Sequence, residues 1–239
     1  MMALNAETAR RAIDDPNHDL SIDDAPVFEG EGATEGAARA LVIACGALAR
    51  EIVDFRAANG FQHLDIACLP AKLHNRPQLI AEAVREKIRA NKSKYRTIFV
   101  AYGDCGTGGG LDAVLAEERV ERIGGPHCYA FYTGQDAFEA ITDEDPTSFF
   151  LTDYMVRHFD RLIIEGLGLD RFPELLNDYF GNYTNVIYIA QTKDPTLEVK
   201  AKAAAERLGL GYIYRFVGFG ELGDFLIAAA AEKEESLTT

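Results

Sequence analysis

Short, continuous apolar runs alternate with helical patterns along most of the chain. The first run extends from Ala40 to Cys45, ends at Gly46 and contains no charged or strongly polar side chain. Such a run is typical of a strand that is buried on both faces of a parallel sheet. Further strands are expected along the chain, and the full set is 40–45, 63–70, 97–102, 123–129, 185–190 and 211–217.

Helical patterns fill the intervals between these runs. Asn59-Gly60 is a typical end signal for a helix that begins near residue 47, and Gly209 ends another one. Pro77 suits the first turn of a further helix. The helices expected in this way are 47–59, 77–90, 111–119, 197–208 and 221–231. Strands that alternate with helices predict an α/β protein with a Rossmann-like parallel sheet and helices on both faces.

The pattern also divides the chain. Residues 1–38 are rich in Asp, Glu, Pro and Gly, lack periodicity and predict a partly irregular acidic arm. Residues 39–239 form the α/β domain, with two α/β tracts at about 39–133 and 182–231. The segment between them, 134–181, carries apolar residues at roughly helical spacing and predicts a helical insertion. These residues are Phe149, Phe150, Leu151, Tyr154, Met155 and Phe159.

Composition and charge exclude several classes of function. The chain has 239 residues, of which 48% are hydrophobic, so a substantial core is expected. The formal net charge of −14 disfavours binding to nucleic acid or to an anionic membrane. No apolar run approaches the ~20 residues that cross a bilayer, and the N-terminus does not resemble a signal peptide. We therefore expect a cytoplasmic protein.

The four cysteines all follow or end an expected strand. Cys45 ends the first strand, Cys68 nearly ends the second, Cys105 comes shortly after the third, and Cys128 lies in or just after the fourth. Because the carboxyl ends of parallel strands meet at one edge of a sheet, thiols that are distant in sequence are expected to gather there. In a cytosolic chain such cysteines are thiols or metal ligands more often than disulfides.

Thiolate and imidazole groups are the ligands that zinc prefers, and thiolates also hold iron–sulfur clusters. The set that we expect is Cys45, Cys105 and Cys128, with His74 as a fourth ligand or as an acid and base. Cys68 and His127 are the substitutes. Inert packing is the alternative for each cysteine, and it suits the apolar surroundings of Cys45 and Cys68 best.

The stretch Tyr102 to Asp112, YGDCGTGGGLD, admits several interpretations. Its glycines could expose amides to an anion at the start of a helix, although neither the Walker pattern nor GxGxxG is present. The run also resembles the glycine-rich motif of class I S-adenosylmethionine methyltransferases. We prefer a third interpretation, in which the glycines let the backbone come close to a metal or a flat ligand while Cys105 points into the cleft. The candidate cofactor-binding residues are Gly106, Gly108 and Gly109, and Asp104 is a candidate catalytic residue beside His74.

Nearby aromatic residues, among them Tyr102 and Tyr129, could line a pocket for a methylated ammonium by cation–π attraction. Ordinary packing is the more frequent role of such residues.

Five blocks of sequence, in order, resemble the family known as domain of unknown function 1638, over about residues 40–225. The blocks are ACGALAREI (44–52), LPAKLHNRP (69–77), YGDCGTGGGLD (102–112), GPHCYAFYTG (125–134) and FFLTDYMVRHFD (149–160). The resemblance implies an association with corrinoid proteins and their methyltransferases in methanogens and methylotrophic bacteria. It therefore implies a role in one-carbon, methyl-transfer or methylated-amine metabolism.

Together these observations favour a metal-dependent enzyme, with zinc or an iron–sulfur cluster, that acts on a small molecule. One alternative is an accessory protein that binds a metal, a corrinoid or a partner subunit of a methyltransferase system. The other is a transferase that binds S-adenosylmethionine or a nucleotide.

Overall fold

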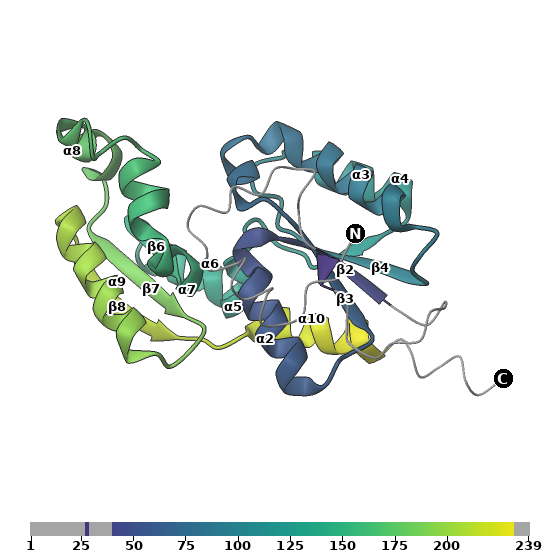
Figure 1. Cartoon of the computed structure of the whole chain (residues 1–239). Coiled ribbons are helices and arrows are strands. Elements are labelled where there is room, and N and C mark those ends of the chain that lie inside the picture. Colours follow the sequence, from purple (N-terminus) through teal and green to yellow (C-terminus); the bar gives the residue numbers. More distant parts are fainter. Residues whose placement is uncertain (1–26, 29–39, 232–239) are drawn as a thin grey trace. The chain divides into compact units, whose positions relative to one another are not determined.

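The computed structural model describes residues 27–28 and 40–231, and Figure 1 shows how their helices and strands are arranged. The chain forms two compact units. The first contains Met1–Phe131 and Glu221–Thr239, and the second contains Tyr132–Gly220. The acidic arm expected over 1–38 lies outside the described residues, except for Val27–Phe28.

The first unit is built on a five-stranded sheet in the order β1-β3-β2-β4-β5. All neighbouring strands are parallel except β1, which is antiparallel to β3. Every residue of β2 and β3 is buried, as the continuous apolar run predicts for β2, and the buried residues of β3 include Asp65. The bounds are β1 Val27–Phe28, β2 Ala40–Cys45, β3 Leu64–Leu69, β4 Thr97–Ala101 and β5 Glu121–Arg122.

Helices cover both faces of this sheet. Helices α3 and α4 lie on one face, and α2 and α10 lie on the other (Figure 1). The architecture is therefore Rossmann-like, as predicted. The helices are α2 Ala49–Asn59, α3 Ile80–Asn91, α4 Gly110–Glu118, α5 Ala130–Thr133 at the unit boundary, and α10 Gly220–Ala231. Short 3-10 turns are η2 Gly46–Leu48, η3 Ala71–Asn75 and η4 Pro77–Leu79.

The second unit has a sheet of its own, with three parallel strands in the order β6-β7-β8. Its strands are β6 Ser148–Thr152, β7 Asn185–Ala190 and β8 Gly211–Phe216. Its helices are α6 Gln135–Glu144, α7 Asp153–Arg157, the π-helical η5 Asp160–Glu165, η6 Pro173–Leu175, α8 Leu176–Phe180 and α9 Pro195–Leu208. No helix in the described part of either unit is both long and apolar enough to cross a bilayer.

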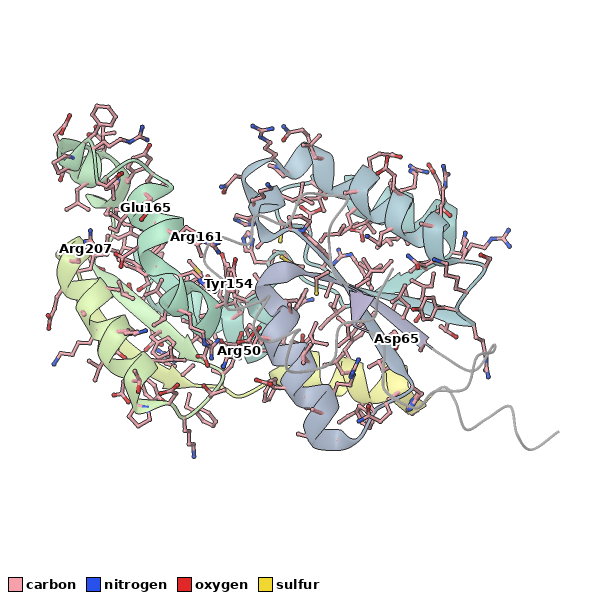
Figure 2. The ribbon with its side chains drawn as sticks, in the orientation of Figure 1. Arg50, Asp65, Tyr154, Arg161, Glu165 and Arg207 are labelled. Atoms are coloured by element: carbon pink, nitrogen blue, oxygen red, sulfur yellow. The ribbon has the colours of Figure 1, made fainter. Side chains whose placement is uncertain are left out.

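Helix α9 packs its small residues Ala201, Ala204 and Ala205 into the core of this unit, against Val186 and Tyr188 of β7. Arg207 of α9, which is labelled in Figure 2, forms an ion pair with Asp160 and so joins the helix to η5 at the surface. Because both side chains are exposed, the buried apolar contacts hold α9 in place more than the ion pair does.

Two sequence predictions of secondary structure are wrong. Phe149, Phe150 and Leu151, expected in a helix of the 134–181 segment, lie in strand β6, because Phe150 pairs with Ile187 of β7. A short aromatic run fits both the helical and the strand periodicity, and the pairing with β7 makes it a strand. No strand forms over 123–129, and the short strand β5 lies just before it, at Glu121–Arg122. The two glycines and the proline of 123–129 do not favour a regular strand.

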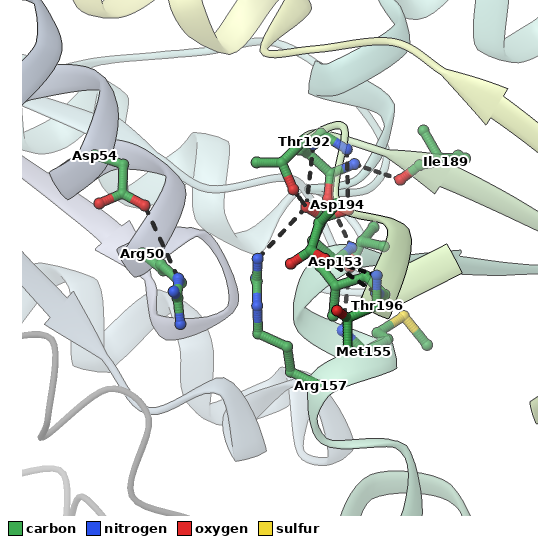
Figure 3. Close-up of polar contacts among 12 residues, drawn as sticks. Arg50, Asp54, Asp153, Met155, Arg157, Ile189, Thr192, Asp194 and Thr196 are labelled. Atoms are coloured by element: carbon green, nitrogen blue, oxygen red, sulfur yellow. Dashed lines mark hydrogen bonds and ion pairs between the residues drawn. The ribbon is translucent and has the colours of Figure 1, made fainter. Parts of the chain in front are cut away.

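A buried carboxylate ties β6 to β7 in the second unit. Asp153 has none of its surface exposed. Its carboxylate accepts hydrogen bonds from the Tyr188 hydroxyl at 2.7 Å and from the Gln191 amide at 3.0 Å. It also accepts from the Thr192 amide at 3.1 Å and lies 3.5 Å from the Arg157 guanidinium (Figure 3). The two strand ends are therefore fixed through one side chain.

We predict that Asp153→Asn lowers the free energy of unfolding by about 1–3 kcal/mol, because an amide nitrogen would face the Thr192 amide and leave a buried donor unpaired. Asp194→Asn makes the same chemical change at the exposed N-cap of α9, where an Asn oxygen still accepts from Thr196 and Leu197. Urea unfolding should separate the two variants. Equal stabilities would contradict the role given to Asp153.

Candidate functional site

Three cysteines meet at the carboxyl end of the first sheet. Cys45 is the last residue of β2, Cys105 lies in the loop after β4, and Cys128 lies in the loop after β5. The sulfur atoms of Cys105 and Cys128 are 3.6 Å apart, which is a hydrogen-bond distance for sulfur. Cys128 lies close enough to Cys45 to lower its pKa, and hydrogen bonding from Cys128 is the largest cause of that shift. The sequence-predicted set of thiols is thus brought together.

The strand order explains why the thiols meet there. From β2 the chain goes to β3 on one side of it and then returns to β4 on the other side. The carboxyl ends of β2 and β4 therefore flank a topological switch point, where parallel α/β sheets open a crevice for ligands. Cys45 ends one of these strands, and Cys105 follows the other.

Backbone hydrogen bonds hold the loops of Cys105 and Cys128 against each other. The Asp104 amide donates to the Gly125 carbonyl at 3.0 Å, and the Cys105 amide donates to the Pro126 carbonyl at 2.8 Å. The Gly103 amide points at the Cys128 sulfur, 3.4 Å away. The two loops therefore meet as paired backbones and place their sulfurs side by side.

Gly103 has no room for a side chain. A Cβ atom at this position would lie 2.8 Å from the carbonyl carbon of His127 and 2.9 Å from the amide nitrogen of Cys128. Cys105 itself has a φ of 48°, a left-handed conformation that is uncommon for a residue with a side chain. The chain thus accepts local strain at the point where the two sulfurs meet.

Arg122 hydrogen-bonds to both loops, a role that the sequence analysis did not predict. Its guanidinium makes two hydrogen bonds to the Asp112 carboxylate, at 2.6 and 3.0 Å. The remaining nitrogen donates to the Ile123 carbonyl at 2.9 Å and reaches the Tyr102 and Gly125 carbonyls at 3.4 Å. Most of its partners are backbone carbonyl oxygens. Every residue has one, so residue types alone do not indicate which carbonyls Arg122 contacts.

The hydrogen bonds of the cluster give its sulfurs different protonation states. The Cys128 thiol, together with His127 and His74, lowers the pKa of Cys105 to about 3. The pKa of Cys128 is raised well above its ordinary value, because its proton serves Cys105 and Cys45. The hydrogen bond to Cys105 raises the pKa of His74. Cys105 is therefore a thiolate with an imidazole beside it.

Cys68, one of the two substitutes, is not a member of this cluster. It lies within β3, has 1% of its surface exposed, and burial raises its pKa. The other substitute, His127, does contribute, since it hydrogen-bonds to Cys105 and stacks on Tyr129. Cys68 therefore provides a matched control for experiments on the other thiols.

Two buried polar atoms beside the thiols lack a partner in the part of the chain that the structure describes. They are the Tyr102 hydroxyl and Nδ1 of His127. The Tyr102 hydroxyl is close enough to Cys45 for each group to shift the pKa of the other, yet no hydrogen bond of normal geometry joins them. A buried polar atom without a partner is costly, so both atoms are suited to meet a ligand.

The glycine loop closes on its own aspartate. The Asp104 carboxylate accepts from the Thr107 hydroxyl, from the Gly108 amide at 3.2 Å and from the Gly109 amide at 3.0 Å. Gly106, Gly108 and Gly109 all have positive φ values, which the turn requires and which glycine adopts without strain. Two amides considered for a cofactor are thus engaged within the loop. The bonds to Thr107 and to the loop amides lower the pKa of Asp104, so it is a weak base.

No three His, Cys, Asp or Glu side chains within residues 27–28 and 40–231 are arranged as a ready-made metal site. The cluster has the hydrogen-bonded arrangement of thiols instead. Its 3.6 Å sulfur separation is nevertheless close to the ~3.8 Å between two thiolates bound to one tetrahedral zinc at about 2.3 Å each.

Residues 68–226 match the family described as "Protein of unknown function (DUF1638)". The match includes His74, Cys105, Cys128 and four of the five sequence blocks, whereas Cys45 and the block at 44–52 precede it. No curated protein and no solved structure matches the chain.

In chelator-treated protein, we predict that the alkylation rate of Cys105 by iodoacetamide changes by less than about twofold between pH 5 and pH 7, because the thiolate is already formed at both values. An ordinary thiol would react about 100-fold faster at the higher pH. Peptide mass spectrometry measures the rate, with Cys68 as the internal control. A steep rise at Cys105 would contradict the assigned thiolate.

Gly103→Ala is predicted to destabilise the protein by about 1–3 kcal/mol, because the added methyl group has no space. Gly110→Ala is the matched control, since its Cβ would meet only ordinary contacts at 3.9 Å or more in the first turn of α4. Urea unfolding compares the two. A Gly103→Ala protein as stable as the wild type would show that the loops are not closely paired.

Proposed function

This chain belongs to the DUF1638 family of proteins of unknown function, and we propose that it is a metal-dependent enzyme that acts on a small molecule. The proposed ligands are Cys45, Cys105 and Cys128, and His74 completes the shell or moves protons. The contact between the Cys105 and Cys128 sulfurs at 3.6 Å carries the proposal, because two loops deliver soft ligands to one point.

The sulfur separation bears on the kind of metal. Two thiolates on one ion lie about as far apart as these two sulfurs do, whereas the irons of a cubane cluster each bind a different thiolate and spread the ligands. The separation therefore favours zinc. Among iron–sulfur centres, it favours only those in which two thiolates share an iron.

The side chains around the thiols have three proposed roles: proton transfer, hydrogen bonding to the substrate and positioning of Cys105. His74 contacts Cys105 and is partly exposed, so it is placed to pass a proton between the site and solvent. The Tyr102 hydroxyl is a buried donor that a substrate oxygen or nitrogen would satisfy. Asp104 keeps the glycine loop closed, and we propose that it positions Cys105 through this loop.

The proposed chemistry is one-carbon or methyl transfer, on a methylated or amine-bearing substrate, as the family resemblance implies. A zinc ion held by thiolates would polarise a substrate or activate a thiol acceptor for such a transfer. A corrinoid protein or a methyltransferase is the proposed partner. The cytoplasm is the proposed location, since all four cysteines are free.

Protein purified without oxygen should contain about one metal ion per chain by elemental analysis, with an absorption spectrum that separates zinc from iron–sulfur centres. We predict that Cys105→Ser and Cys128→Ser each lose most of this metal, because each removes a thiolate ligand. Cys68→Ser should retain it.

Full retention of metal by both Cys105→Ser and Cys128→Ser would contradict the proposed ligands. Circular dichroism on each variant separates loss of a ligand from loss of the fold. Bound metal without turnover of methylated amines, alone or with a corrinoid protein, would indicate the accessory role in place of an enzyme.

A further inference from the structure

We propose that Cys105 and Cys128 form a peroxide-sensitive dithiol, in which one sulfur is oxidised and the other then closes a reversible disulfide with it. The proposal uses two sulfurs of the proposed metal site but needs no metal. The modification is a disulfide between Cys105 and Cys128, which is distinct from metal binding.

The sulfur atoms of Cys105 and Cys128 are positioned to react with each other. The two sulfurs are already in contact at 3.6 Å, and the backbone bonds from Asp104 to Gly125 and from Cys105 to Pro126 keep their loops together. Cys105 retains 6% and Cys128 8% of their surface, compared with 1% for Cys68. A small oxidant therefore reaches this pair more readily than it reaches Cys68.

Closure requires a small movement of the two sulfurs, and the glycines after Cys105 let its turn adjust at low steric cost although Asp104 holds the turn closed. A disulfide bond is about 2.05 Å long, so the sulfurs must approach each other by roughly 1.5 Å. Glycines follow Cys105 at positions 106 and 108 to 110, in a turn with several positive φ values. Cys45, which also contacts Cys128, is the last residue of a fully buried central strand and has less freedom to move.

The chemistry balances with hydrogen peroxide as the oxidant. The thiolate of one cysteine attacks one peroxide oxygen, the O–O bond breaks, and with one proton the products are its sulfenic acid and water. The thiol of the other cysteine then attacks the sulfenic sulfur, which forms the S–S bond and releases a second water. The peroxide gains two electrons and the two sulfurs lose them. A dithiol reductant reverses the reaction through a mixed disulfide.

The test uses the full-length, chelator-treated protein and hydrogen peroxide. After the reaction is quenched and the protein denatured, the free thiols should fall from four per chain to two and return to four with dithiothreitol. Peptide mass spectrometry should find Cys105 joined to Cys128. Cys68→Ser should form the same link, whereas Cys105→Ser and Cys128→Ser should lose it.

A link between Cys45 and Cys128, or four free thiols after treatment, would overturn the proposal. The wild-type peptide map decides this even if a serine variant fails to fold. The disulfide is measured without metal, so its absence leaves the metal proposal standing. Equally, a protein that never binds metal could still form the link.

Discussion

Two loop backbones approach each other closely at the carboxyl end of the first sheet. The amides of Asp104 and Cys105 donate to carbonyls of the segment before Cys128, and Gly103 leaves no gap where they pass. Arg122 holds carbonyls of both loops with one guanidinium. The sulfur contact, the shared proton and the proposed ligand set all depend on this pairing, because no sequence-local motif brings the cysteines together.

Once the loops are paired, the chemistry of the cluster follows from how few polar groups surround it. A thiolate that loses water must be stabilised by neighbours, and Cys105 has the Cys128 thiol and two imidazoles for this purpose. A bound metal ion would replace these hydrogen bonds with metal–sulfur bonds, because thiols lose their protons when they become metal ligands. They also place a second thiol beside the first, so metal binding and oxidation would compete for the same two sulfurs.

The sequence predicted the parallel sheet well, because strands such as Ala40–Cys45 are buried on both faces and read as continuous apolar runs. It also predicted that Cys45, Cys105 and Cys128 would gather, since the rule about strand ends needs no detail of the side chains. It missed β6, where five residues fit two periodicities and tertiary pairing decides. It missed Arg122 because backbone carbonyls leave no mark in a sequence.

In the proposed site, sulfurs from separate loops bind one ion. X-ray absorption spectroscopy at the edge of the metal bound to the protein is the sharpest test, because it counts the atoms that the metal contacts. We expect two or three sulfur scatterers at about 2.3 Å, with a nitrogen or oxygen completing a tetrahedral shell. A shell of oxygen and nitrogen alone would contradict it.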